Sequence, residues 1–165
     1  MGIRVLFVCL GNICRSPTAE GVFRQLCSEA GIDHAVSADS AGTGGYHVGD
    51  PPDERSQRAA RARGIEIGDL RARQVSVTDF EAFDYVLAMD RENYRHLTAM
   101  CPPIWRGKLH LLMDFAPESA AGELPDPYFG DGDGFELVLD LAEAAGRGLV
   151  ARIRQQHLAP RRAFR

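Results

Sequence analysis

The most constraining feature of this 165-residue sequence is a nearly continuous apolar run at residues 4–10, RVLFVCL. A run without polar alternation is typical of a strand that is buried on both faces. Further strand-like segments lie at 35–42, 84–90 and 108–115, and segments with helical spacing lie at 16–31, 53–64, 91–97 and 135–157. Strands that alternate with helices predict βαβ units around a mostly parallel sheet, so we expect an α/β fold.

Length and composition narrow the class of protein. The chain has no internal repeat and no linker, so we expect one domain over residues 1–165, with a frayed tail at about 158–165. The net charge of −4 gives no reason to expect a nucleic acid as partner, and no apolar run is long enough to predict a membrane span. The N-terminus does not resemble a secretory signal, and free thiols are typical of a reducing cytosol, so we expect a cytoplasmic protein.

The segment between the first apolar run and the first helix has the composition of an anion-binding loop. It reads CLGNICRSP from Cys9, and Ser16 and Pro17 are typical of an N-cap and a first helical position. A loop that leads into a helix N-terminus turns its backbone N–H groups towards a bound anion. Gly11 and Asn12 tolerate the positive φ angles that such a curled loop needs. The segment therefore predicts a cradle for a phosphate-like group.

Cys9 and Arg15 are the candidate reactive residues of this loop. Arginine presents a planar fork to two phosphate-type oxygens, and the positive surroundings of such a loop favour the thiolate form of a central cysteine. A thiolate under an anion cradle suits the transfer of a phosphoryl group to sulfur. The competing interpretation is a core cysteine beside a surface arginine, which the spacing C-x5-R-S between a strand and a helix disfavours.

Phosphoryl transfer from an ester also needs a proton donor for the leaving oxygen. Asp126 lies between two prolines in LPDPYFGDGDG, and a plain turn is the competing interpretation because Asp-Pro is common in turns. In parallel α/β sheets, however, ligands bind outside the carboxyl ends of the strands. This rule brings to one rim residues 9–15, residues 40–46, Asp90 and the loop after Phe115. We therefore expect Asp126 beside the anion cradle, whereas Asp90 either orders the rim or caps the helix that follows it.

Several longer motifs occur in a fixed order along the chain. They are VCLGNICRSPTAEG (8–21), DSAGT (39–43), VGDPPDER (48–55), RARQV (71–75), AMD (88–90) and DPYFGD (126–131). In this order they resemble the landmarks of the low-molecular-weight protein tyrosine phosphatase family, over nearly the whole chain. The resemblance implies a four-stranded parallel sheet with helices on both faces and a phosphate-binding loop between the first strand and the first helix. It also implies that the protein uses no metal and no cofactor.

The same resemblance implies a role for each candidate residue in the hydrolysis of phosphotyrosine, an aryl phosphate monoester. Cys9 would form a phosphocysteine intermediate, Arg15 would bind the phosphoryl oxygens, and Asp126 would act as general acid and then as general base. Ser16 would hydrogen-bond the sulfur of Cys9, and Ser40 would help to hold the loop. The substrate would be bound by Leu10, Gly11, Asn12, Ile13, Cys14, Tyr46 and Tyr128.

One position departs from the family's pattern. Many members carry a histidine shortly before the R-A-R-Q segment, where it supports the side-chain network of the loop asparagine, whereas this chain has Leu70. We therefore expect the network around Asn12 and Ser40 to be rearranged.

Cys14 is a second thiol on the loop that carries Cys9. Because peroxide attacks accessible thiolates, we expect oxidation at Cys9 to be followed by a Cys9–Cys14 disulfide. The competing interpretation is that Cys14 only packs under the loop. Cys27 lies on the apolar face of the first helix and is expected in the core, and Cys101 has no evident partner.

Two other functions share parts of these motifs. An arsenate reductase on the same scaffold would use the cysteine–arginine loop, but it would need a relay of further cysteines that Cys27 and Cys101 do not supply. A non-catalytic phosphotyrosine-binding module would lack either the nucleophile or the acid, and both are present. The favoured partners are therefore phosphotyrosine-containing proteins or small aryl phosphates, with phosphate-type anions as inhibitors.

Overall fold

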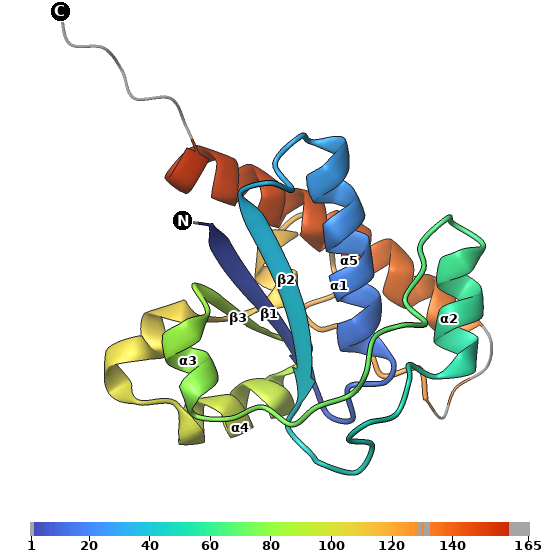
Figure 1. Cartoon of the computed structure of the whole chain (residues 1–165), viewed down its shortest axis with the longest axis horizontal. Coiled ribbons are helices and arrows are strands. Elements are labelled where there is room, and N and C mark those ends of the chain that lie inside the picture. Colours follow the sequence, from blue (N-terminus) through green and yellow to red (C-terminus); the bar gives the residue numbers. More distant parts are fainter. Residues whose placement is uncertain (1, 129, 131–132, 159–165) are drawn as a thin grey trace, which may run out of the picture.

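A single parallel sheet forms the centre of the molecule. The computed structural model describes residues 2–128, 130 and 133–158. Within this range the strands β1 (Ile3–Cys9), β2 (Val36–Gly42), β3 (Tyr85–Ala88) and β4 (Leu109–Leu111) are ordered β2-β1-β3-β4. Every neighbouring pair is parallel, which confirms the predicted fold class (Figure 1). The frayed tail predicted at about 158–165 lies, apart from Leu158, outside the described residues.

Helices cover both faces of the sheet, as Figure 1 shows. On one side lie α1 (Arg15–Glu29), α5 (Asp133–Ile153) and, beside them, α2 (Glu54–Arg61). On the other side lie α3 (Thr78–Ala82) and α4 (Arg91–Met100). Shorter 3-10 turns span Pro103–Lys108 and Leu112–Phe115, and a π turn spans Arg154–Leu158. No helix in the part of the chain that the structure describes has the length and the hydrophobicity to cross a bilayer.

The apolar run of β1 is explained by its central place in the sheet. Val5 and Phe7 face the core that α1 and α5 cover, and Leu6 and Val8 face the core on the side of α3 and α4. Because successive side chains of a strand point to opposite faces, both sets must be apolar. Cys9, at the end of β1, belongs to the α1 side and is 3% exposed. The strand therefore delivers a buried thiol to the carboxyl end of the sheet.

Some predicted boundaries were wrong. The strand predicted at 108–115 is only three residues long, because β4 lies at the edge of the sheet and pairs with β3 as far as Leu111 before the chain turns into the 3-10 helix Leu112–Phe115. Helix α3, with five residues, was not predicted because it is too short to show a helical repeat. Helix α2 begins after Asp53, whose side chain accepts a hydrogen bond from the backbone N–H of Arg55.

Gly148 on α5 permits a close contact between that helix and the 3-10 turn Leu112–Phe115, which follows β4. A Cβ atom at this position would overlap the carbonyl oxygen of Phe115, which is backbone and cannot rotate away. Overpacking against backbone that cannot move aside costs about 3 kcal/mol, the upper end of the usual range, whereas Gly→Ala in a helix gains about 1 kcal/mol. We expect Gly148→Ala to lower the free energy of unfolding by about 2 kcal/mol and Tm by about 4–8 °C.

Calorimetry of Gly148→Ala beside Gly107→Ala tests this contact. A Cβ at Gly107 has no heavy atom within 4 Å, so the control should unfold close to the parent's Tm. An unchanged Tm in Gly148→Ala would show that α5 can move away from Phe115 at little cost.

Candidate active site

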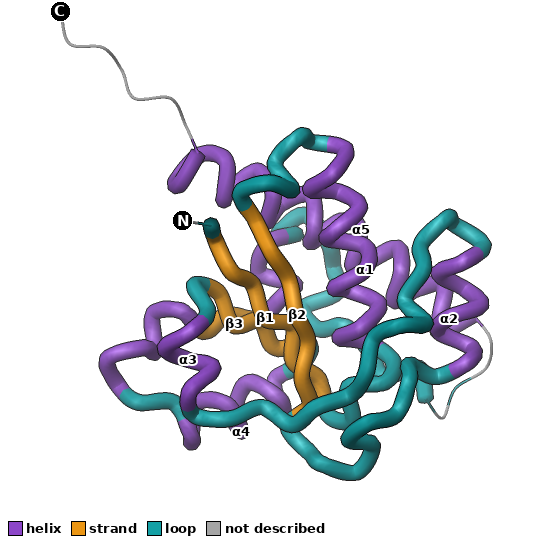
Figure 2. Tube along the Cα trace, viewed as in Figure 1, coloured by secondary structure: helices purple, strands orange, loops and turns teal. Residues whose placement is uncertain are grey.

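A pocket lies at the carboxyl ends of the strands. Figure 2 shows that loops from several parts of the chain, drawn in teal, come together at this end of the sheet. The volume of the pocket is about 140 Å³. The residues that line it are Cys9, Leu10, Gly11, Ile13, Cys14, Arg15, Tyr46, His47, Asp126 and Tyr128. The structure thus brings together all of the predicted catalytic and substrate-binding residues except Asn12. The side chain of Asn12 does not line the pocket and bonds instead to Ser16 and Ser40. His47 is an additional lining residue.

The sulfur of Cys9 lies at the centre of the curled loop. It accepts a hydrogen bond from the backbone N–H of Asn12 at 3.2 Å and lies 3.0 Å from the hydroxyl oxygen of Ser16. Among the described residues, the backbone N–H groups of Gly11, Ile13, Cys14 and Arg15 meet no hydrogen-bond acceptor. Donors left open around a pocket are what an anion needs, so this loop can hold a phosphate-like group.

Asn12 holds the curl of the loop from behind. Its φ angle is 59°, in the left-handed region, and its side-chain amide donates to Ser16 Oγ at 2.8 Å and to Ser40 Oγ at 3.0 Å. Its amide oxygen accepts a hydrogen bond from the backbone N–H of Arg73 at 2.9 Å. These contacts compensate for the strain of a non-glycine residue at positive φ.

Of the two loop residues that tolerate a positive φ angle, Asn12 takes that conformation and Gly11 does not. Gly11 is instead suited to its place by size. A Cβ atom there would lie 3.1 Å from the ring of His47, so glycine leaves room for His47 at the pocket wall.

The side chain of Asn12 is hydrogen-bonded on both its amide nitrogen and its oxygen, although position 70 is a leucine. Leu70 packs against the main hydrophobic core, and Asn12 is held by Ser16, Ser40 and the backbone of Arg73. The sequence did not single out Arg73, although its guanidinium group binds the carboxylates of Asp39 and Asp79 at 3.1 and 3.0 Å. These ion pairs fix the segment whose backbone reaches Asn12.

The first helix begins earlier than predicted. Ser16 and Pro17 were expected as the N-cap and first helical residue, but α1 begins at Arg15, after Cys14. Pro17 still lies in the first turn, where a missing N–H costs no intrahelical hydrogen bond. The hydroxyl of Ser16 is thereby available to the sulfur of Cys9.

Arg15 is held in a fixed orientation although it is almost fully buried, at 3% exposure. Nη1 donates to Asp90 Oδ2 at 2.6 Å and to the carbonyl oxygen of Leu124 at 3.1 Å, and Nη2 lies 3.6 Å from Asp126 Oδ2. Burial alone would lower the pKa of Arg15, but Cys9, Asp90 and Asp126 raise it overall. The guanidinium group therefore remains charged at the base of the pocket.

Asp90 combines the two alternatives that the sequence left open. Its Oδ1 accepts a hydrogen bond from the backbone N–H of Asn93 at 2.7 Å and so caps α4, while its Oδ2 pairs with Arg15. One carboxylate therefore ties the arginine of the loop to the start of α4.

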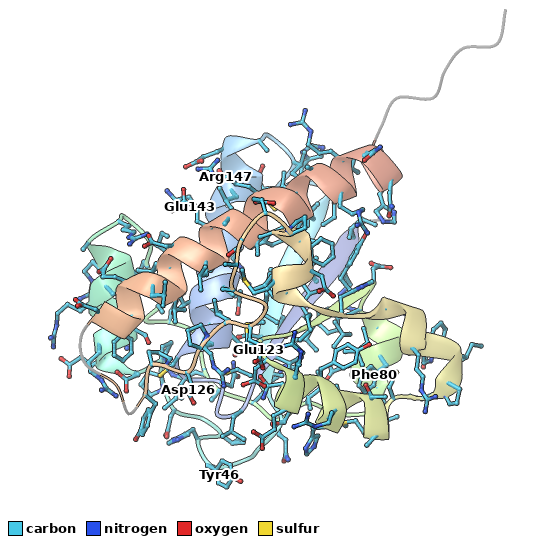
Figure 3. All side chains as sticks on the ribbon, turned by 180° about the vertical axis from the view of Figure 1, so that it is seen from behind. Tyr46, Phe80, Glu123, Asp126, Glu143 and Arg147 are labelled. Atoms are coloured by element: carbon cyan, nitrogen blue, oxygen red, sulfur yellow. The ribbon has the colours of Figure 1, made fainter. Side chains whose placement is uncertain are left out.

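Asp126 and two tyrosines form the outer part of the pocket. The side chain of Asp126 is 41% exposed, and its Oδ1 accepts a hydrogen bond from the backbone N–H of Tyr128 at 3.0 Å. The guanidinium group of Arg55 lies 5.4 Å from the centre of the Tyr128 ring. Tyr46 is exposed and comes from a different loop, and Figure 3 shows it at the same end of the molecule as Asp126. A planar group bound in this pocket would therefore meet two aromatic side chains.

The remaining cysteines are buried free thiols. Cys14 packs with Ile13, Ala72 and Phe135, and its burial raises the pKa of the thiol to about 12. Cys27 lies in the main core, and Cys101 donates a hydrogen bond to the carbonyl oxygen of Pro102 at 3.4 Å. Within the described ranges, no three histidine, cysteine or acidic side chains are grouped so that they could hold a metal ion.

Known proteins are similar to this chain over most of its length. The family model of the low molecular weight phosphotyrosine protein phosphatases matches residues 4–159. YfkJ of Bacillus subtilis, a low molecular weight protein-tyrosine-phosphatase, is 43% identical over 154 residues, which cover 93% of this chain and 97% of that protein. The human low molecular weight phosphotyrosine protein phosphatase is 43% identical over 136 residues, which cover 81% of this chain and 85% of that protein.

Solved structures agree with the sequence comparisons. A protein tyrosine phosphatase from Entamoeba histolytica, with Hepes in its active site, is similar to this chain with a TM-score of 0.91 and 38% identity. The match covers 93% of this chain and 98% of that one. The match over nearly the whole length, together with the arrangement of the pocket, shows that the chain belongs to the low molecular weight phosphotyrosine protein phosphatase family.

Proposed function

We propose that this phosphatase hydrolyses phosphotyrosine and related aryl phosphate monoesters through a phosphocysteine intermediate at Cys9. Protein-tyrosine phosphatase activity is the activity of its family. The observation that carries the mechanism is the surroundings of the Cys9 sulfur. This atom lies in a pocket lined by open backbone N–H groups, the Arg15 guanidinium group and the Asp126 carboxyl group.

In the first step the Cys9 thiolate attacks phosphorus, and the bond from phosphorus to the phenolic oxygen breaks. The backbone donors of the loop and Arg15 balance the negative charge on the three equatorial oxygens. The protonated carboxyl group of Asp126 gives its proton to the leaving phenolic oxygen. Asp126 lines the same pocket as Cys9 and its side chain is 41% exposed, which supports this role.

In the second step water attacks phosphorus, and the bond from sulfur to phosphorus breaks. Asp126, now a carboxylate, accepts a proton from the attacking water, and the products are inorganic phosphate and the free enzyme. Ser16 donates a hydrogen bond to the departing sulfur, which stabilises the thiolate. Its oxygen accepts a hydrogen bond from Asn12 and lies 3.0 Å from Cys9 Sγ, which is a closer acceptor for the Ser16 proton than the Ala41 carbonyl oxygen at 3.5 Å.

The depth of the pocket favours an aryl ester. The sulfur is buried, whereas Tyr46 and Tyr128 at the mouth are 77% and 37% exposed, so the reacting phosphorus must be carried inwards by a long, flat group. The Hepes molecule in the Entamoeba structure carries a sulfonate group, which supports binding of phosphate-type anions as inhibitors. We therefore infer phosphotyrosine-containing proteins and small aryl phosphates as substrates, with no nucleic acid and no membrane as partner.

The free thiols are consistent with a cytoplasmic protein.

Turnover of para-nitrophenyl phosphate, measured beside reduction of arsenate, separates this function from the two alternatives. A phosphatase should release para-nitrophenol and phosphate and should leave arsenate unchanged. Arsenate reduction needs a relay of further cysteines, and Cys14 is the only other thiol among the described residues at the pocket. Arsenate reduction at a comparable rate would favour a reductase. Tight binding of a phosphotyrosine peptide without turnover would favour a non-catalytic binding module.

Cys14 is proposed to protect Cys9 from irreversible oxidation. Peroxide converts the Cys9 thiolate to a sulfenic acid, and attack by the Cys14 sulfur then forms a disulfide and releases water. Because burial raises the pKa of Cys14 to about 12, little of it is thiolate at neutral pH, so closure should be slow enough for excess peroxide to compete. We expect Cys14→Ser to lose activity to peroxide as the parent does but to recover much less with a thiol reductant.

Peptide mapping by mass spectrometry after mild oxidation checks this prediction. Cys101→Ser is the matched control, since a serine hydroxyl can replace the hydrogen bond to Pro102. This control should recover as the parent does. Full recovery of Cys14→Ser, with no Cys9–Cys14 cross-link in the parent, would leave Cys14 a packing role alone.

A further inference from the structure

Arg55, in the first turn of α2, is a charged side chain near the pocket to which the mechanism above assigns no role. It ends the motif VGDPPDER (48–55), and its side chain is 42% exposed. Its guanidinium group lies 4.7 Å from the centre of the Phe135 ring and 5.4 Å from the centre of the Tyr128 ring. A cation within about 6 Å of the centre of an aromatic ring is attracted to that ring. One side chain of α2 therefore contacts two aromatic rings, of which Tyr128 lines the pocket.

Asp53 fixes the direction of the Arg55 side chain. Oδ1 of Asp53 accepts hydrogen bonds from the backbone N–H of Arg55 at 2.8 Å and from Nε at 3.0 Å, and Oδ2 accepts one from Nη2 at 3.0 Å. A carboxylate that binds two nitrogens of a guanidinium group at once sets the plane of that group. These hydrogen bonds also lower the pKa of Asp53, so the pair stays charged at neutral pH.

The pair of Asp53 and Arg55 is attached to the phosphate-binding loop. The backbone N–H of Asp53 donates to the carbonyl oxygen of Ile13 at 2.7 Å. Phe135, the nearer of the two rings, is buried in a cluster with Ile13 and Cys14. The guanidinium group is therefore held from two sides by contacts that lead back to the loop.

Tyr128 is the more exposed of the two rings that Arg55 contacts. It is 37% exposed, whereas Phe135 is 4% exposed, and its backbone N–H donates to Asp126 at the outer part of the pocket. A side chain that must be ordered when a ligand binds costs conformational entropy, so a wall that is already fixed binds more tightly. Attraction to a cation that is itself held in place would fix the Tyr128 ring in this way.

We propose that Arg55 is a positioning residue that increases the selectivity of the pocket for aryl esters, because it holds the Tyr128 ring where the ring of the substrate binds. A phosphate-type group without a ring reaches only the loop and Arg15, so its binding should not depend on Arg55. The inference rests on the proposed function, but its test measures binding and not turnover.

The test compares two ligands with the same phosphonate group, benzylphosphonate and methylphosphonate. Only the first carries an aromatic ring, and neither is hydrolysed, because phosphorus is bonded to carbon. Calorimetric titration gives both values of Kd, and the Kd of methylphosphonate divided by that of benzylphosphonate measures the aryl selectivity. Arg55→Ala should lower this ratio by about two- to fivefold. The lost charge affects both ligands alike and cancels in the ratio.

Arg58→Ala is the matched control on the same helix. It removes the same charge, and Arg58 is 72% exposed and lies 3.8 Å from the carboxylate of Glu54. Its ratio should equal that of the parent. A fall as large as that of Arg55→Ala would assign the effect to the charge of α2 and would overturn the proposal.

Tyr128→Leu tests whether Arg55 acts through the ring. In this background Arg55→Ala should leave the ratio unchanged, because the ring that Arg55 holds is gone. An effect as large as in the parent would show that Arg55 acts on the ligand directly and would overturn the proposal.

Equal losses for the two phosphonates in Arg55→Ala would also overturn the proposal, since a purely structural role weakens both alike. This result, with aryl selectivity intact in the parent, would leave the proposed function standing. Equal affinity of the parent for both phosphonates would instead contradict the preference for aryl esters in the proposed function, and this inference with it.

Discussion

Cys9→Ser is expected to lower kcat for aryl phosphates by at least about 10⁴-fold, while phosphate still binds. A serine hydroxyl is not ionised at neutral pH and is a far weaker nucleophile than a thiolate. The anion site, however, is made by Arg15 and by the backbone N–H groups of the loop, which the substitution leaves in place. Steady-state kinetics and calorimetric titration with phosphate measure the two properties separately.

The matched control for this experiment is Cys27→Ser, which changes a buried thiol that lies in the main core and does not line the pocket. The control should keep kcat close to that of the parent. Substantial turnover by Cys9→Ser would remove Cys9 from its role. Loss of phosphate binding together with turnover would show that the loop had collapsed.

Asp126→Asn is expected to slow the hydrolysis of phenyl phosphate by about 10²–10⁴-fold, since asparagine cannot donate the proton that the leaving oxygen needs. The loss should become smaller along the series phenyl, para-nitrophenyl and dinitrophenyl phosphate, because more acidic phenols leave without a proton. Asp126 also lies 3.6 Å from Arg15, so its removal changes the charge beside the phosphoryl site. The dependence on the leaving group separates the two effects.

Asp50→Asn serves as the control for this change in charge. Asp50 is an exposed carboxylate that pairs with His47 at the mouth of the pocket, with 3.3 Å between Oδ2 and Nδ1. We expect its substitution to change kcat by less than about threefold, since surface pairs are worth about 1 kcal/mol or less. A loss for Asp126→Asn that is equal across the three esters would assign Asp126 to the shape of the loop or to the charge of the pocket.

The sequence predicted best what lies in one continuous segment. Cys9 and Arg15 occur on a single strand–loop–helix unit, so their chemistry could be predicted from their spacing together with the buried strand before them and the helix after them. Asp126 is distant in sequence, but the rule that ligands bind at the carboxyl ends of parallel strands brought it to the same rim. The four strands were likewise predicted, although the one predicted at 108–115 is only three residues long.

Contacts between distant side chains could not be predicted in this way. The sequence placed Asp90 on the rim but could not choose between its two roles, and the structure shows that one carboxylate performs both. Arg73 supports Asn12 through its backbone N–H, which no side-chain motif reveals.

The central claim is that the phosphoryl group passes to the sulfur of Cys9, and trapping of the intermediate tests it most directly. The enzyme is mixed with para-nitrophenyl phosphate, denatured within milliseconds at neutral pH, digested, and mapped by mass spectrometry. We predict a phosphoryl group on the peptide that contains Cys9. It should form as fast as the burst of para-nitrophenol and should be lost at the rate of turnover. A burst of para-nitrophenol with Cys9 unmodified, or with the phosphoryl group on another residue, would contradict this claim.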